Sequence, residues 1–283
     1  KHRTHLTNNT QPNICVIEPV SFTDDELDFL LTAPGDRQAE GAFWNQFQHA
    51  DLLGPLIQPD PELTTQLAEH LTTLDTADDL LTTDITQRAR RVVSQAATLG
   101  QSYSVVVANP PYMGAKNMGQ RLAEYAKSAY PLSRADLFAI FIERNLALAQ
   151  PHGYVAMITM QAWMFLSGFE NLRKRLVEMA AVRTLAHLGV GAFESIAGAV
   201  VTTVAFVIAT SPDPTCRGTY IKLTDLPDER SKEKTLLRVA AGAGSDHVYA
   251  LSGSQLAHIP GSTLSYWMST ELLNAFNGGD LLV

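Results

Sequence analysis

Residues 104–114, with the sequence SVVVANPPYMG, limit the possible folds of this chain more than any other stretch. The run from Val105 to Val107 is β-branched, which is typical of a strand that is covered on both faces of a parallel sheet. Pro110 and Pro111 follow, and each proline fixes φ near about −65° and has no N–H group for a sheet ladder. The stretch therefore predicts a buried strand that ends in a stiff loop.

The loop after this strand offers groups that could recognise a flat, amino-bearing ligand. In open α/β sheets, ligands bind outside the carboxyl ends of the strands, where this loop would stand. The Asn109 amide oxygen and a free carbonyl oxygen are two acceptors for an NH₂ group, and the Tyr112 ring suits a planar partner such as adenine. For the four residues Asn-Pro-Pro-Tyr alone, an ordinary rigid loop without a ligand is the alternative.

The loop resembles motif IV of the S-adenosylmethionine-dependent amino-methyltransferases, through the residues Asn109, Pro110, Pro111 and Tyr112. A wider similarity, carried by residues 107–114 and 136–144, is to the adenine-specific DNA methyltransferases of the BREX and phage-growth-limitation (PglX) defence systems. The resemblance implies the class I methyltransferase fold, an α/β architecture with a Rossmann-like sheet flanked by helices. It also implies that the Asn side chain and the first Pro carbonyl hold the acceptor nitrogen.

Three further residues are candidate site residues, each with an ordinary alternative. By resemblance, Phe193 stands where an aromatic residue of motif VIII stacks on the target base, although it could pack in a core. Lys116 is available to a phosphate or merely solvated. By resemblance, Asp51 lies where an acidic residue of motif III contacts the adenine of the cofactor, although it could cap a turn. The family often has Gly-Glu-Val-Val where this chain has GAVV at 198–201, which leaves no carboxylate there.

The resemblance implies that S-adenosylmethionine donates a methyl group to the N6 amino group of adenine in double-stranded DNA. The adenine must first leave the base stack, and stacking between Tyr112 and Phe193 would offset part of that cost, at about 1–3 kcal/mol per base. Catalysis by positioning requires neither a metal nor a covalent intermediate. Consistent with this expectation, Cys15 and Cys216 show no metal-ligand spacing.

Two other functions remain open from the sequence. The same loop could methylate an RNA base or a protein glutamine, because those methylases share the Asn-Pro-Pro-Tyr motif. Alternatively, the chain could be a non-catalytic DNA-binding scaffold of a defence complex, with other subunits of that complex as partners.

Charge and hydrophobicity narrow the classes of partner. The net charge of −8 argues against indiscriminate DNA binding, but residues 109–187 carry 9 Lys and Arg against 5 Asp and Glu. A locally positive face is what phosphate contacts need, although a solvated helix surface would give the same count. No apolar run approaches the roughly 18 residues that span a bilayer. We therefore expect a cytoplasmic protein without a membrane partner.

The order of motifs predicts two segments. Residues 1–210 are expected to be part of a methyltransferase catalytic domain with a helical insertion at about 59–100, and residues 211–283 a connector toward a target-recognition region. No Gly-rich cofactor loop of the kind that precedes motif IV in the family occurs upstream of Asn109. The resemblance thus predicts the second part of the catalytic domain only, which by itself should bind the cofactor poorly and be inactive.

Local patterns give further predictions. Residues 12–18 look like a strand, and Ser133 is expected to cap the helix that follows the loop. Arg173 is expected to face water on a later helix, while His187 is expected to be a buried histidine with its hydrogen bonds satisfied. The charged run at 228–234 is assigned to the connector.

Overall fold

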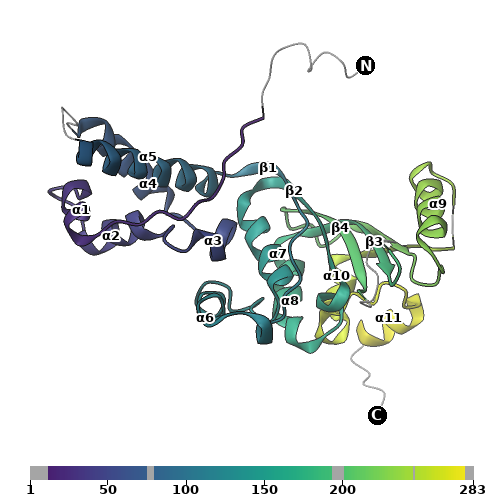
Figure 1. The fold of residues 1–283 in the computed structure, drawn as a ribbon. Coiled ribbons are helices and arrows are strands. Elements are labelled where there is room, and N and C mark those ends of the chain that lie inside the picture. Colours follow the sequence, from purple (N-terminus) through teal and green to yellow (C-terminus); the bar gives the residue numbers. More distant parts are fainter. Residues whose placement is uncertain (1–11, 75–79, 193–200, 245, 278–283) are drawn as a thin grey trace. The chain divides into compact units, whose positions relative to one another are not determined.

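The computed structural model describes residues 12–74, 80–192, 201–244 and 246–277 (Figure 1). The chain divides into two compact units, residues 1–101 and residues 102–283, and each is described by itself. These units do not coincide with the predicted domains, 1–210 and 211–283. The roles assigned to those domains stay predictions.

The described part of unit 1 is helical. Its elements are α1 (Asp24–Leu30), α2 (Arg37–Asn45), α3 (Ala50–Leu53), the 3-10 turn η1 (Gly54–Leu56), α4 (Pro61–Thr73) and α5 (Leu80–Gly100). The predicted insertion at about 59–100 contains α4 and α5, whose buried side chains pack in one core with Trp44 and Phe47. The strand predicted at 12–18 is wrong. The described residues of unit 1 form no strand that could pair with it, and the Glu18 N–H donates instead to the Gln95 side chain.

Unit 2 is built on a six-stranded mixed sheet with the order β1-β2-β4-β3-β5-β6. The strands are β1 (Tyr103–Ala108), β2 (Ala149–Met160), β3 (Ala181–Gly189), β4 (Thr203–Ala209), β5 (Arg217–Lys222) and β6 (Val248–Ser252). β1 is parallel to β2 and β3 is parallel to β5, whereas β4 is antiparallel to both β2 and β3. The carboxyl ends of β1, β2, β3 and β5 therefore meet at one edge of the sheet.

Helices cover one face of the sheet, and α7 and α8 lie beside it in Figure 1. The helices of unit 2 are α6 (Gln120–Ala129), α7 (Leu137–Leu148), α8 (Glu170–Met179), α9 (Glu229–Ala240), α10 (Gly253–His258) and α11 (Thr270–Asn277). Short 3-10 turns are η2 (Ala115–Asn117), η3 (Gln161–Met164), η4 (Ser167–Phe169) and η5 (Pro260–Ser262). Phe138 of α7, Leu172 of α8 and Val155 of β2 belong to one core. The predicted α/β class, a sheet flanked by helices, is confirmed.

β1 differs from its prediction as a strand covered on both faces. Its Val106 and Ala108 pack against the core, but Val105 and Val107 on the other face are 55% and 75% exposed. Among the described residues, β1 is the end strand of the sheet and pairs with β2 alone. The β-branched run correctly predicted a strand, because Val is enriched in strands, but it did not reveal that one face of the strand is exposed.

The described part of residues 211–283, which are predicted to be a connector, forms strands and helices in the structure. These residues supply β5 and β6 to the sheet, and the charged run at 228–234 forms the start of α9. Asp228 is the N-cap of this helix, and its carboxylate accepts a hydrogen bond of 2.7 Å from the Ser231 N–H. The helix was missed because its sequence has few large apolar residues, so its hydrophobic periodicity is weak.

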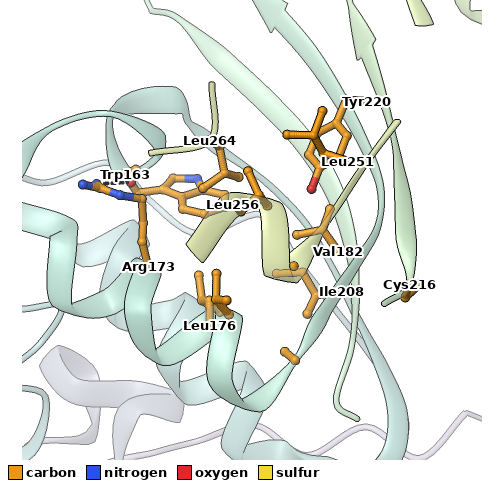
Figure 2. Close-up of a pocket in the computed structure, with 13 residues that line it drawn as sticks. Trp163, Arg173, Leu176, Val182, Ile208, Cys216, Tyr220, Leu251, Leu256 and Leu264 are labelled. Carbon is orange, nitrogen blue, oxygen red and sulfur yellow. Dashed lines mark hydrogen bonds between the residues drawn. The ribbon is translucent and has the colours of Figure 1, made fainter. Parts of the chain in front are cut away.

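Arg173 of α8 is buried, with 1% of its surface exposed, so the prediction that it faces water is wrong. Its guanidinium donates to the carbonyl oxygens of Trp163 at 2.9 Å, Leu166 at 2.7 Å and Gly261 at 2.8 Å. Figure 2 shows Arg173 beside Trp163 at the margin of a small internal cavity of about 20 Å³. A cavity of this size holds about one water molecule, so it is part of the core and not a ligand site.

Candidate active site

The polar tip of the candidate site is the loop that follows β1. Asn109 is exposed at the carboxyl end of the strand, whereas the next residue, Pro110, is buried. Tyr112 is half-buried and meets the ring of Phe138 edge-on, with centroids 6.2 Å apart and an interplanar angle of 90°. Burial raises the pKa of the Tyr112 hydroxyl. In this loop, Pro110 and Tyr112 are thus wholly or partly buried, whereas the Asn109 amide is exposed and available to a ligand.

The loop is fastened to the start of α7 by Asp136. The Asp136 carboxylate accepts a hydrogen bond of 3.2 Å from the Met113 N–H, and the Met113 carbonyl accepts one of 2.9 Å from the Leu137 N–H. Gly114 forms an antiparallel bridge with Asp136. These hydrogen bonds therefore join residues 107–114 to residues 136–144. The same two stretches carry the resemblance in the sequence.

Asp136 is also the N-cap of α7, because its side chain accepts a hydrogen bond of 3.3 Å from the Phe138 N–H. Burial raises the pKa of the Asp136 carboxyl group, and the backbone hydrogen bonds that it accepts oppose the rise. The capping role predicted for Ser133 is wrong. The Ser133 hydroxyl instead donates to the Glu143 carboxylate at 2.7 Å and so bonds the residues before α7 to the middle of that helix.

Asn109 borders an apolar groove of about 480 Å³ on the open face of the sheet. Its lining residues are small or apolar except for Asn109 and Thr184, and the remainder are Val107, Ala108, Ala156, Met157, Ile158, Ala186, Ala205, Phe206, Val207 and Leu236. The last of these comes from α9. One amide beside an apolar surface is suited to a flat ring that carries an amino group, because the ring needs a non-polar wall and the amino group needs acceptors.

The predicted site residues are brought together only in part. Asn109, Pro110, Pro111 and Tyr112 form one loop, and Lys116 lies exposed in η2, which follows it. Phe193 and residues 198–200 lie outside the described residues. Asp51 is exposed in α3 of unit 1. Their assigned roles stay predictions.

The lining of the groove does not fit S-adenosylmethionine. This cofactor carries a sulfonium, an ammonium and a carboxylate group, and charged groups need charged or hydrogen-bonding partners when water is excluded. The described residues that line the groove include no carboxylate or cation. The groove lining therefore offers a non-polar wall and an amide, but no charged partner for the predicted methyl donor.

The described residues contain neither a candidate metal site nor a candidate membrane-spanning helix. No three or more His, Cys, Asp or Glu side chains within the described ranges are grouped so that they could hold a metal ion. In the same part of the chain, each helix is too short or too polar to cross a membrane.

His187 of β3 has both ring nitrogens hydrogen-bonded, as predicted. Nε2 lies 2.6 Å from Gln161 Oε1, and because an amide oxygen only accepts, Nε2 carries the proton. Nδ1 lies 2.9 Å from the Tyr266 hydroxyl, which therefore donates to it. Burial, with a smaller contribution from the positive charge of Lys222, lowers the pKa of His187 to about 4. The ring is neutral at physiological pH and serves the structure.

Comparison with known proteins gives consistent matches. The profile of the Eco57I restriction-modification methylase family matches residues 36–193. The adenine-specific methyltransferase PglX of Lacticaseibacillus casei (strain Zhang) is 38% identical over 184 residues, which are 65% of this chain and 15% of that protein. The adenine-specific methyltransferase BrxX of Escherichia coli O9:H4 (strain HS) is 36% identical over 233 residues, which are 81% of this chain and 19% of that protein. These relatives confirm the resemblance predicted from the sequence.

A similar solved structure is that of a nuclease-deletion mutant of the Type ISP restriction-modification enzyme LlaGI in complex with a DNA substrate mimic. It has 12% sequence identity and a TM-score of 0.47, over 83% of this chain and 21% of that one. The present chain thus spans less than a fifth of the length of the curated relatives that it matches.

Proposed function

The chain belongs to the Eco57I restriction-modification methylase family, and on this basis we propose that it forms part of an enzyme that methylates the N6 amino group of adenine in DNA. The proposed methyl donor is S-adenosylmethionine, and the proposed context is a phage-defence or modification system. The proposed macromolecular partner is double-stranded DNA, with other subunits of the defence system as further partners. Such an enzyme works where the DNA is, in the cytoplasm.

One observation carries the proposal. Asn109 stands exposed at the carboxyl end of β1, in a loop that Asp136 fastens to α7, and it borders an apolar groove. The Asn109 side-chain oxygen and the Pro110 carbonyl oxygen are the two acceptors for the two hydrogens of the adenine amino group. Accepting both hydrogens turns the nitrogen lone pair out of conjugation with the ring. The lone pair then points at the atom to be attacked.

The adenine reaches this loop only after it has left the duplex, because its amino group is otherwise paired and stacked. Extrusion costs a few kcal/mol, and contact of the base with the Tyr112 ring offsets about 1–3 kcal/mol of this cost. Phe193 is proposed as the second stacking partner on the strength of the resemblance. The proton of the amino group leaves to water after transfer, so no general base is assigned.

S-adenosylmethionine, when bound, supplies the methyl group. Because the lining of the groove does not fit this cofactor, we assign to the chain the binding and orientation of the acceptor. Asp51 is proposed to contact the adenine of the cofactor, again by resemblance. A chain of residues 1–283 by itself is expected to bind the cofactor poorly.

The test is the substitution Asn109→Ala in the longest native polypeptide that contains this sequence. Loss of one preorganised hydrogen-bonding group at a reacting centre typically lowers kcat by a factor of about 10² to 10³. We expect methyl transfer to unmethylated DNA to fall by at least that factor, with little change in stability, because Asn109 is exposed.

The matched control is Asn171→Ala, which removes an exposed amide from α8. The control should transfer methyl groups at the rate of the unsubstituted enzyme. Near-normal turnover by the Asn109→Ala enzyme would exclude the role assigned to this residue.

A further inference from the structure

A row of cations runs along one face of α9. Arg230, Lys234 and Arg238 are spaced four residues apart, so they share a helix face and extend over about 12 Å. All three side chains are exposed, and none forms a hydrogen bond or ion pair with another residue in the described part of the chain. We call these three residues the α9 cation row.

The cation row is unusual for this part of the chain. Residues 188–283 carry 6 Lys and Arg against 9 Asp and Glu, yet 4 of those 6 cations lie in α9. The row borders a shallow groove of about 440 Å³, which is lined by Arg230, Glu233, Lys234, Leu237, Arg238 and Ala241. Three cations against the single carboxylate of Glu233 give this groove a positive charge.

The fourth cation of the helix, Lys232, holds α9 in place. Lys232 is buried, and its ammonium group donates to the carbonyl oxygen of Val190, the first residue after β3. The start of α9 is therefore attached at the carboxyl end of β3, which lies at the same edge of the sheet as the carboxyl end of β1.

The opposite side of α9 reaches the candidate active site. Leu236 lines the apolar groove that Asn109 borders, and its neighbour Leu237 lines the positively charged groove. One helix thus separates the two grooves. A molecule whose base lay beside Asn109 would have the rest of its backbone within reach of the cation row.

We propose that the α9 cation row binds the phosphate backbone of the DNA substrate next to the target adenine. This inference rests on the proposed function. A DNA duplex carries about one negative charge per 1.7 Å of its axis, so a row of about 12 Å faces several phosphates. Arg and Lys contacts to phosphates position a protein on DNA without reading its sequence, so the row serves affinity and register. Fixing the backbone beside the extruded nucleotide keeps the base in the site.

The experiment measures DNA binding by the longest native polypeptide at several salt concentrations. The variant carries Arg230→Gln, Lys234→Gln and Arg238→Gln together. Each phosphate contact contributes about 0.9 to the slope of log K against log salt, so the slope should become shallower by about 2.7. Affinity at about 0.1 M salt should fall at least tenfold, by a similar factor for DNA of any sequence.

The control variant removes the same charge elsewhere, by Arg37→Gln on α2 and by Arg90→Gln and Arg91→Gln on α5. These residues are exposed and belong to unit 1, whereas α9 belongs to unit 2. The control should keep the slope of the unsubstituted protein. If the salt slopes of the α9 variant and the control were equal, the proposal would be overturned. The α9 cations would then contribute no more to DNA binding than cations elsewhere on the protein.

A further measurement separates this inference from the proposed function. If the unsubstituted polypeptide methylates DNA and the α9 variant binds DNA with an unchanged salt slope, the inference fails and the proposed function stands. If the unsubstituted polypeptide neither binds nor methylates DNA, both fail. Binding of the α9 surface to anionic lipid vesicles but not to DNA would also overturn the inference.

Discussion

The imidazole of His187 shows how a single buried side chain links structure to pH. In the folded protein its pKa is lowered from 6.5 to about 4, chiefly by burial. Between these two values the unfolded chain binds a proton that the folded chain does not, so acid favours unfolding. The contribution of the neutral ring to the free energy of unfolding is fully present above about pH 6.5. This contribution decreases as the pH falls, and it is lost at about pH 4.

We expect the free energy of unfolding to decrease by about 3 kcal/mol over this pH interval because of His187, since each pKa unit corresponds to about 1.4 kcal/mol. His187→Asn should make the free energy of unfolding less dependent on pH in the same interval, whatever its effect at pH 7. Denaturant unfolding at several pH values between 4 and 7 measures both quantities. An unchanged pH dependence in the variant would show that His187 titrates normally.

Arg173 and Arg175 are neighbours on α8 with opposite surroundings. Arg173 donates to three turns of the chain through buried hydrogen bonds, whereas Arg175 is exposed. Arg173→Met leaves carbonyl groups of Trp163, Leu166 and Gly261 without this donor, and the free energy of unfolding should fall by about 3 kcal/mol. Arg175→Met should change it by no more than about 0.5 kcal/mol. Equal effects in denaturant unfolding would contradict this account.

The surroundings of single residues were predictable from the sequence where their partners are close in the chain, or where burial alone determines their role. The Asn109 loop follows from two prolines next to a strand, and the buried state of His187 follows from its place in an apolar strand. Arg173 was not predictable, because helix periodicity groups it with Lys174 and Arg175. Its carbonyl partners come from turns up to 88 residues away, which no local pattern identifies.

At the scale of elements, the loop after β1 and the helix α7 act together through Asp136. Asp136→Ala removes the acceptor for the Met113 N–H and the N-cap of α7. Loss of the cap should cost about 1 kcal/mol of stability, and a looser loop should lower methyl transfer about tenfold or more.

Asp136→Asn provides the discriminating comparison, because an Asn oxygen can accept the same hydrogen bonds. This variant should recover most of the stability and most of the transfer rate. Measurements of kcat, KM and denaturant unfolding on both variants test the prediction. If Asp136→Ala transferred methyl groups normally, the loop would be rigid through its prolines alone.

The sequence predicted elements best where apolar spacing is strong. The helical insertion at about 59–100 was expected and contains α4 and α5, but α9 was assigned to a connector because charged residues dominate its surface. For β1, the type of element was correct and its burial was wrong, since a valine run does not reveal whether a strand lies at an edge. The strand predicted at 12–18 failed for the converse reason, because a strand requires a partner strand, whereas the regular elements in the described part of unit 1 are helices.

At the scale of the molecule, two cores that share no residue underlie the two units. Unit 1 holds the helical core around Trp44 and Leu67, and unit 2 holds the sheet core and the Asn109 loop. The sequence indicated the helical insertion but placed the next boundary at residue 210. The strands β5 and β6 continue the sheet beyond that point, because strand pairing follows the whole sheet and not the order of motifs.

The central claim of the proposed function is that the acceptor is the N6 atom of adenine in DNA. The most direct measurement uses the longest native polypeptide, methyl-labelled S-adenosylmethionine, and DNA, RNA and a glutamine-containing peptide in competition. Mass spectrometry of the digested products identifies the labelled atom. We predict N6-methyladenine in DNA alone, lost with Asn109→Ala. Label in RNA or peptide, label at another atom of DNA, or no label with any substrate would contradict the account.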